Sequence, residues 1–232
     1  MAKAEPLGVL FALLASFLWL VTSVYSIGYM RGHGEAHQTR FYACFAAALG
    51  STMGVALAGN LFTLFIFYEL LTLTTYPLVT HSGDAAARRA GRVYLGLLLG
   101  SSVAFFLLAL VATWSLTGTL AFRHGGILAG VVSPGTAAIL LALYLFGIGK
   151  AALMPLHRWL PAAMVAPTPV SALLHAVAVV KAGAFGIVRV VYDVYGVEFE
   201  WFKQLDFLAI FCISDHNLSI QFTQIESMHR LT

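Results

Sequence analysis

Residues 147–161 read GIGKAALMPLHRWLP and place a lysine, Lys150, inside a mostly apolar part of the chain. Gly147 and Gly149 precede the lysine, and glycine loosens a helix because its backbone has wide conformational freedom. Pro155 follows the lysine and cannot donate a hydrogen bond to the carbonyl four residues back. The pattern therefore predicts a helix that is broken beside Lys150. Broken helices at membrane depth are tolerated where they line a cavity or a binding site.

The composition of the whole chain favours a membrane setting. Of its 232 residues, 60% are hydrophobic and 10% are charged, whereas soluble domains carry about 25% charged residues. The 13 basic and 10 acidic residues give a net charge of +3. These values exclude a disordered chain, a basic nucleic-acid-binding domain and a disulfide scaffold. Cys44 and Cys212 lie far apart in apolar surroundings, so they imply neither a disulfide framework nor a metal site.

Six apolar runs extend along the chain, and each is close to the roughly 20 helical residues that cross a bilayer core. No alternation typical of a β-barrel is visible, so helices are the remaining way to satisfy the backbone in lipid. We expect an all-α polytopic membrane protein with about six transmembrane helices, one of them broken. The runs cover residues 7–29, 41–62, 63–80, 93–116, 136–157 and 168–188.

Basic residues in the connections between runs predict the orientation. The connections after the first, third and fifth runs hold six arginines, against one, Arg123, in the other two. The positive-inside rule then places these three connections in the cytoplasm and the N-terminus outside, in the inner (plasma) membrane of the cell. The first run is longer than the apolar region of about 7–15 residues in a signal peptide, so cleavage is a minor alternative. The six arginines are Arg31, Arg40, Arg88, Arg89, Arg92 and Arg158.

Three charged residues, Glu69, Lys150 and Lys181, fall within the predicted bilayer. A charged side chain at the middle of a membrane helix costs about 2.5–3.5 kcal/mol, and such residues are functional sites by default. For Glu69, the alternative is a neutral carboxyl that is hydrogen-bonded inside the bundle, although the hydroxyls of Thr72 and its neighbours could hold water near it. For Lys150, the alternative is a side chain that snorkels to the inner interface while the proline only kinks the helix.

The run at 168–188 opens with Thr168 and Pro169, which predict a side-chain cap followed by proline at the first helical position. His175 and Lys181 are six residues apart, or about 240° around a helix, so they do not share a face. A hydrogen-bonded core histidine is the commoner interpretation of an isolated His175. Pairing or snorkelling is the corresponding alternative for Lys181.

His157 lies beside Arg158 and Trp159 at the predicted cytoplasmic end of the break. It is an entry point for protons or, equally, part of an interfacial anchor. Together with Glu69 and Lys150 it belongs to a row of titratable groups on separate helices. Histidine titrates near neutral pH, and a carboxylate that moves toward or away from a buried lysine changes how readily the lysine releases its proton. This row is a physical basis for gated proton transfer.

Two stretches of the chain resemble the antiporter-like proton-translocating membrane subunits. They are FIFYELLTLTTYPLV at residues 65–79 and GIGKAALMPLHRWLPAAMVAPTPVSALLHAVAVVKAG at residues 147–183. That family includes large membrane-arm subunits of respiratory complex I, subunits of multi-subunit Na+/H+ antiporters and membrane subunits of energy-converting hydrogenases. The block PLHRWLPAAMVAPTPVSALLHA is long and specific, and the resemblance runs from about residue 25 to residue 195.

The resemblance implies roles for individual residues. Glu69 matches the family's fifth-helix glutamate, and Lys150 matches the lysine on its broken seventh helix. His175 matches the eighth-helix histidine or lysine that continues the proton path, whereas Lys181 is matched only in some branches. The glutamate–lysine pair is expected to control proton release as conformational changes pass along the complex. The residues predicted to transfer protons are therefore Glu69, Lys150, His175, Lys181 and His157.

The family fold holds two inverted five-helix repeats, and this chain resembles one of them. We expect an N-terminal transmembrane helix and cytoplasmic loop at residues 1–40 and a five-helix proton-translocation repeat at residues 41–192. Residues 193–232 form an atypical tail that contains six of the ten acidic residues and no apolar run long enough to span a bilayer. The tail predicts a truncated or frameshifted product, or a split subunit, without the second repeat that supplies the family's exit path.

Three functions stay open from the sequence, and a quinone site, for which no distinctive pocket signature appears, is a fourth option. The chain is a proton-translocating subunit of an NADH:quinone oxidoreductase-like or hydrogenase complex, a component of a cation/proton antiporter that uses Na+, or a non-conducting scaffold or inactive fragment. No haem motif, CxxC cluster or glycine-rich nucleotide loop occurs, so we expect no cofactor and no metal. The expected partners are other membrane subunits, the lipid bilayer and protons, and any electron transfer would belong to partner subunits.

Overall fold

The structure is a computed structural model that describes residues 5–196 of the chain. Within this range the chain is almost entirely helical. The longer helices are α1 (Pro6–Gly32), α2 (Gln38–Ala56), α3 (Leu61–Val79), α4 (Ala85–Ser101), α5 (Leu107–Thr117), α6 (Pro134–Gly147) and α9 (Val179–Arg189). The shorter elements are η1 (Ser102–Phe106), η2 (Gly149–Ala151), η3 (Leu156–Arg158), α7 (Trp159–Ala163), α8 (Thr168–Ala172), η4 (Leu173–Val177) and η5 (Val190–Tyr195).

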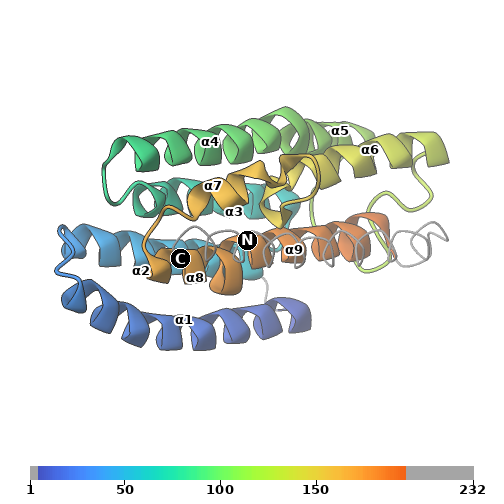
Figure 1. Cartoon of the computed structure of the whole chain (residues 1–232). Coiled ribbons are helices and arrows are strands. Elements are labelled where there is room, and N and C mark those ends of the chain that lie inside the picture. The colour runs from blue at the N-terminus through green and yellow to red at the C-terminus, as the bar shows by residue number, and fades with distance from the viewer. Residues whose placement is uncertain (1–4, 197–232) are drawn as a thin grey trace.

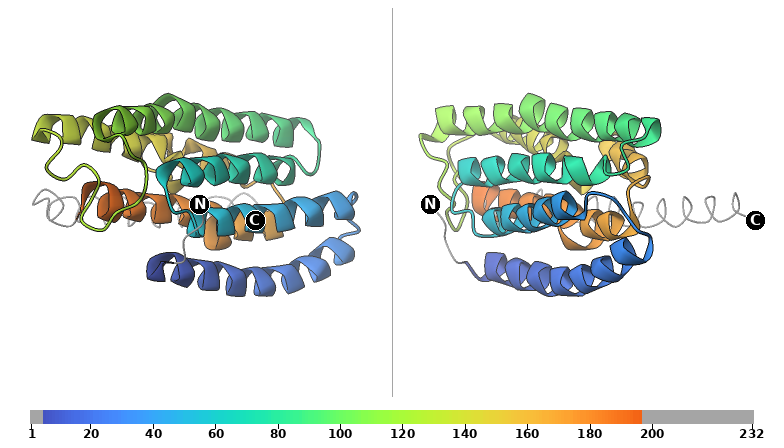
Figure 2. Two further views of the ribbon diagram at one scale, coloured as in Figure 1. Left: turned by 180° about the vertical axis from the view of Figure 1, so that it is seen from behind. Right: turned by 90° about the vertical axis from the view of Figure 1, so that its left-hand side faces the viewer.

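The long helices lie side by side along one direction, as Figure 1 and Figure 2 show. α4, α5 and α6 form one edge of this bundle, and α1 forms the opposite edge. α2, α3 and α9 lie between the two edges, and the short helices α7 and α8 connect α6 to α9. The predicted all-α architecture is confirmed for the described residues.

Four helical segments among the described residues are long and apolar enough to cross a membrane. They are α1, α3, the continuous segment from α4 through α5, and the continuous segment from α8 through η5. α6 is apolar but has 14 residues, and α2 has 19 residues with more small and polar side chains. Each of the six predicted runs therefore corresponds to one helical segment, although the segments differ in length.

Side-chain caps place the starts of two helices differently from the prediction. Asn60 accepts a hydrogen bond from the backbone N–H of Thr63 through Oδ1 at 2.6 Å, so α3 begins earlier and α2 ends earlier than the apolar runs suggested. Asp84 accepts one from the N–H of Ala87 at 2.6 Å, so α4 begins within the expected loop. The three arginines predicted for that loop are therefore exposed on the first turns of α4: Arg88, Arg89 and Arg92.

The last helical segment also differs from the prediction at both ends. Thr168 is the first residue of α8, and no side chain caps this helix, so the predicted threonine cap is wrong. The segment continues through α9 and η5 to Tyr195, beyond the predicted end at residue 188. Most of the predicted tail, residues 197–232, lies outside the described part of the chain.

Aromatic side chains fill the centre of the bundle. The Phe106 ring packs edge-on against Tyr68, with ring centroids 5.7 Å apart, and against Tyr144, with centroids 5.9 Å apart. All three residues are fully buried, so α3, η1 and α6 are held together by ring contacts. In contrast, α1 exposes large apolar side chains such as Leu13 and Val24, a surface that suits lipid.

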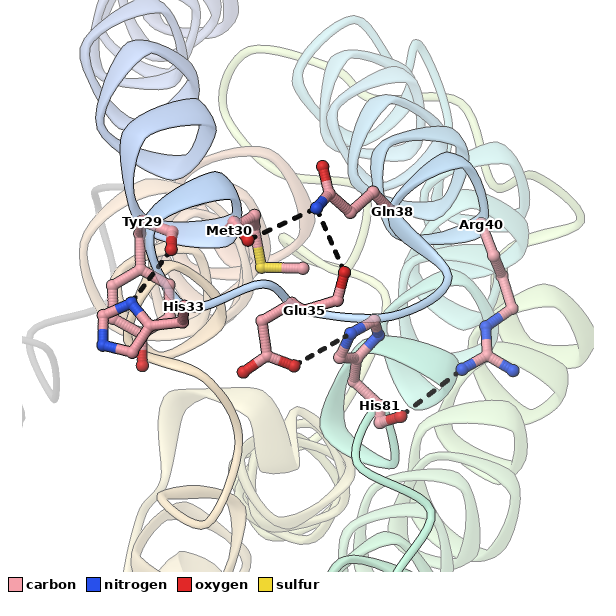
Figure 3. Close-up of polar contacts among 7 residues, drawn as sticks. All are labelled: Tyr29, Met30, His33, Glu35, Gln38, Arg40 and His81. Atoms are coloured by element: carbon pink, nitrogen blue, oxygen red, sulfur yellow. Dashed lines mark hydrogen bonds and ion pairs between the residues drawn. The ribbon is translucent and has the colours of Figure 1, made fainter.

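The loop from α1 to α2 and the loop from α3 to α4 meet at one end of the bundle, as Figure 3 shows. The Glu35 carboxylate lies 3.8 Å from Nε2 of His81, and the Arg40 guanidinium donates to the His81 carbonyl oxygen at 3.4 Å. Nε2 of Gln38 donates to the carbonyl oxygens of Glu35, at 3.0 Å, and Met30, at 3.3 Å. These contacts join the end of α3 to the ends of α1 and α2.

Protonation of His81 should weaken the fold. Burial lowers the pKa of His81 below its usual value of 6.5, and Arg40 and His37 lower it further, while Glu35 opposes the shift. Because the unfolded chain then binds this proton at a higher pH than the folded chain, the free energy of unfolding falls as the pH drops below about 6.5. We expect a lower thermal unfolding temperature in detergent at pH ~5.5 than at pH ~7.5, and a smaller difference in His81→Gln. The exposed His33 provides the control variant, His33→Gln, and an equal pH effect in both variants would contradict the assignment.

Candidate functional site

The helix that carries the lysine is broken as the glycines and proline predict. α6 ends at Gly147, rather than continuing to residue 157, and the chain then forms the short 3-10 turns η2 and η3. Ala152, between the two turns, adopts a left-handed conformation with φ of 55°. Lys150 lies in η2 and is fully buried, so it does not snorkel to an interface.

Tyr68 of α3 contacts Lys150 at three points. The Lys150 ammonium donates to the backbone carbonyl oxygen of Tyr68 at 2.7 Å, and Nζ lies 3.2 Å from the centroid of the Tyr68 ring. The backbone N–H of Lys150 donates to the Tyr68 hydroxyl oxygen at 2.9 Å. The ammonium therefore sits between a peptide oxygen and an aromatic face, both of which stabilise a cation.

Glu69 follows Tyr68 in α3, and the structure brings it close to Lys150. The two side chains interact electrostatically, but both carboxyl oxygens of Glu69 are buried without a hydrogen bond to any described residue. The Ser102 hydroxyl lies beside the carboxyl yet donates to the Leu98 carbonyl oxygen at 2.9 Å. The carboxyl group of the half-buried Glu69 is therefore buried near Lys150, with no hydrogen bond or ion pair between the two side chains among the described residues.

The threonine hydroxyls near Glu69 donate to their own helix. Thr72 donates to the Tyr68 carbonyl oxygen at 3.4 Å, Thr74 to that of Leu70 at 2.9 Å and Thr75 to that of Leu71 at 2.6 Å. Such bonds to the preceding turn are common for Thr in apolar helices. The Thr75 hydroxyl also meets the Tyr94 hydroxyl at 2.7 Å, which ties α3 to α4.

Trp159 supports the break from its other side. Its indole N–H donates to the Gly149 carbonyl oxygen at 3.0 Å, and its ring packs edge-on against Tyr94 with centroids 5.5 Å apart. Trp159 is fully buried, so it is not the lipid-facing part of an interfacial anchor with His157. Tyr68 and Trp159 thus provide hydrogen-bond partners for two backbone groups of the broken helix, the N–H of Lys150 and the carbonyl oxygen of Gly149.

Gly183 allows α9 to pack directly on the break. A Cβ atom at this position would overlap the backbone of Lys150 and Ala151. At Gly186, one turn along α9, a Cβ atom would only touch the Ile148 side chain at 3.6 Å. Small residues permit such close approach of backbones in membrane bundles.

The three other predicted residues lie in different surroundings. His157 is half-buried in η3, and its Nδ1 atom makes no hydrogen bond to any described residue. His175 is half-buried in the π-helical turn η4, which packs against α1 and α9. Lys181 is exposed on α9. That His175 and Lys181 do not share a face stays a prediction, because the π-helical turn η4 separates His175 from α9. The structure thus brings Glu69 and Lys150 together and leaves Lys181 on the bundle surface.

A second buried charged cluster lies at the other end of α9, and the sequence did not indicate it. Arg189 pairs with Glu5, and its Nη1 atom lies 2.8 Å from the Asp193 carboxylate. Its Nη2 atom donates to the Ala58 carbonyl oxygen at 3.1 Å, and the guanidinium carbon lies 4.1 Å from the centroid of the Phe122 ring. The signal was hidden because the apolar run was expected to end at residue 188, which placed Arg189 and Asp193 outside the membrane segment.

The family model described as "NADH:quinone oxidoreductase/Mrp antiporter, TM" matches residues 58–217, a range that contains α3, the break and η4. The chain belongs to this family. The resemblance drawn from the two sequence stretches is therefore confirmed.

Two curated relatives illustrate the range of the family. The chain is 36% identical over 203 residues to NAD(P)H-quinone oxidoreductase chain 5 of Synechocystis sp., which covers 82% of this chain and 29% of the relative. It is 35% identical over 198 residues to a probable K(+)/H(+) antiporter component of Rhizobium meliloti, which covers 83% of this chain and 19% of the relative. The chain thus spans less than a third of the length of either relative.

A solved structure gives the same fold. A chain of the membrane-bound sulfane sulfur reductase, an archaeal respiratory membrane complex, matches with a TM-score of 0.76 and 27% identity. The match covers 89% of this chain and 41% of the archaeal chain. The helical arrangement described here is therefore similar to that of one chain of this archaeal complex.

Proposed function

We propose that this chain carries protons as a membrane subunit, or part of one, in an NADH:quinone oxidoreductase-like or cation/proton antiporter complex. The observation that supports the proposal best is the fully buried Lys150 ammonium in a broken helix, beside the buried and unbonded carboxyl of Glu69. Keeping such charges at membrane depth is costly, and proteins retain them at ion and proton pathways.

The chemistry of the pair follows from charge. An ionised carboxylate beside a buried lysine stabilises the ammonium form, and its protonation or withdrawal favours release of the lysine proton. Because no hydrogen bond to a described residue fixes the Glu69 carboxyl, rotation of the Glu69 side chain changes its distance from Lys150. The pair therefore suits a cycle in which a conformational change loads and unloads one proton.

The remaining candidates are assigned around this pair. We assign His157, half-buried in η3 after the break, to proton entry and His175 in η4 to the continuation of the path. Lys181 would join the path only if a partner helix covered the exposed face of α9. Other membrane subunits are therefore the partners that the proposal requires.

The orientation is part of the proposal. Arg31, Arg40 and the exposed arginines of α4 gather at the end of the bundle where Glu35 meets His81, whereas Arg123 lies in the connection between α5 and α6. By the positive-inside rule the arginine-rich end faces the cytoplasm. The N-terminus would then lie outside, in a plasma membrane.

Proton transport by reconstituted complexes tests the proposal. The chain is assembled with its neighbouring subunits in liposomes, and formation of a pH gradient is measured for Lys150→Ala and Glu69→Gln. We expect each variant to lose at least about tenfold in rate, because each removes a group through which the proposed proton path passes. A tenfold loss corresponds to a transport barrier raised by about 1.4 kcal/mol.

The exposed Arg123 provides the matched control, since Arg123→Ala removes a charge outside the helices. This variant should transport protons at the rate of the unmodified complex. Unchanged transport in both Lys150→Ala and Glu69→Gln would remove the assigned roles and favour the alternative of a non-conducting scaffold.

A further inference from the structure

Tyr68 is fully buried and holds Lys150 through three different groups. Its hydroxyl oxygen accepts the backbone N–H of Lys150, its carbonyl oxygen accepts the ammonium, and its ring lies against the ammonium. The first contact fixes the backbone of the break, and the other two fix the end of the side chain. A single residue therefore determines both where the lysine is anchored and where its proton is held.

The hydroxyl contact answers a specific need of the broken helix. The turn at η2 interrupts the regular ladder of α6, and a buried N–H without an acceptor is costly in an apolar medium. The Tyr68 hydroxyl supplies that acceptor at 2.9 Å. Trp159 performs the complementary task for the Gly149 carbonyl oxygen at 3.0 Å, and this bond joins it to the backbone of the break rather than to the lysine side chain.

The position of Tyr68 beside Glu69 links the two charged groups mechanically. Neighbouring residues of a helix point about 100° apart, so Tyr68 faces the break while Glu69 lies to one side. A rotation or shift of α3 that moves the Glu69 carboxyl must also carry or break the three contacts of Tyr68. A movement of α3 that changes the distance between Glu69 and Lys150 therefore also involves Tyr68, whereas rotation of the Glu69 side chain alone leaves the Tyr68 contacts in place.

We infer that Tyr68 is a positioning residue that fixes Lys150 at the helix break and couples its position to the helix that bears Glu69. The inference rests on the proposed role of Lys150 in proton transfer and goes beyond it. It assigns a role to a neutral side chain: Tyr68 keeps the Lys150 ammonium in a fixed position relative to α3, the helix that bears Glu69. Of the three Tyr68 groups that contact Lys150, the hydroxyl is the one that a substitution can remove without removing the other two.

Tyr68→Phe tests the inference because it deletes the hydroxyl and keeps the ring and the carbonyl. In the reconstituted complex we expect the rate of pH-gradient formation to fall about threefold to tenfold and its pH profile to shift by at least about half a unit. Tyr144→Phe is the matched control, since Tyr144 is also fully buried and its hydroxyl bonds to Thr113 at 2.7 Å. A merely structural loss would affect both variants alike and leave both pH profiles in place.

Hydrogen exchange gives a second readout that does not depend on transport. In Tyr68→Phe, amide exchange in the peptide spanning residues 147–156 should accelerate at least about tenfold, which corresponds to about 1.4 kcal/mol of lost protection. The same peptide should keep its rate in Tyr144→Phe. In the unmodified chain, the peptide spanning residues 147–156 should exchange as slowly as α3. This measurement still tests the inference if Tyr68→Phe does not fold.

The outcomes separate this inference from the proposed function. If Lys150→Ala abolishes transport while Tyr68→Phe keeps the pH profile and the slow exchange, the positioning role is wrong and the proton path stands. If the break exchanges faster in Tyr68→Phe while Lys150→Ala transports normally, the positioning of the backbone stands and the proposed function is wrong. Exchange of the unmodified break as fast as the exposed loop after α5 overturns the inference by itself.

Discussion

Arg189→Met is expected to lower the free energy of unfolding by about 3–5 kcal/mol, the cost of removing one partner from a buried charge pair. The Arg189 side chain is 3% exposed, and it pairs with the carboxylates of Glu5 and Asp193. Without the guanidinium, two carboxylates stay buried near each other and lose the cation that they share. The Ala58 carbonyl oxygen and the face of Phe122 also lose their contact with the guanidinium.

Denaturant or thermal unfolding in detergent measures this effect, with Arg123→Met as the control because Arg123 is exposed. The control should change the free energy of unfolding by less than about 0.5 kcal/mol. Adding Glu5→Gln and Asp193→Asn to Arg189→Met should recover part of the loss, since replacing a whole buried ion cluster is often nearly neutral. Equal effects of Arg189→Met and Arg123→Met would show that the cluster does not stabilise the bundle.

Gly183→Ala is expected to destabilise the chain by about 1–3 kcal/mol, although alanine is ordinarily the better helix former. The added Cβ atom would overlap backbone atoms of Lys150 and Ala151, and backbone cannot rotate away as a flexible side chain can. α9 must therefore move off the break, or the break must shift. Either change disturbs the contacts of Lys150 with Tyr68.

Gly186→Ala is the matched control, because it lies on the same helix and its new Cβ atom would meet the Ile148 side chain at an ordinary 3.6 Å. There the gain in helix propensity should dominate, and stability should stay equal or rise by up to about 1 kcal/mol. Unfolding in detergent compares the two variants. The same sign of effect for both would contradict close backbone packing at Gly183.

Much of the fold could be predicted because lipid imposes simple rules. Apolar runs of nearly 20 residues indicated six helical segments, and the two glycines and Pro155 indicated the break. Helix ends were predicted less well, because Asn60 and Asp84 begin helices by local hydrogen bonds that hydropathy does not register. The end of α6 at Gly147 shortened a run whose apolar character continues past the helix.

The candidate site was predicted only in part. Glu69 and Lys150 stood out because a charge inside an apolar run is visible in the sequence. The roles of Tyr68 and Trp159 were not visible in the sequence, since aromatic residues are common in membrane helices. Nothing in their spacing indicates a hydrogen bond to a distant part of the backbone. Arg189 and Asp193 were missed because three-dimensional pairing with Glu5 crosses nearly the whole described chain.

The shortness of α6 has a mechanical consequence. At 1.5 Å per residue its 14 residues extend about 21 Å, whereas the hydrocarbon layer is about 30 Å thick. The rest of this run is formed by η2, η3 and the chain around them, where Tyr68 and Trp159 bond to the backbone and α9 packs closely against it. One half of this run is a regular helix, and the other half is irregular chain whose shape depends on three neighbouring elements. The surroundings of the lysine are thus set by contacts with α3, α7 and α9 rather than by the hydrogen-bond ladder of α6.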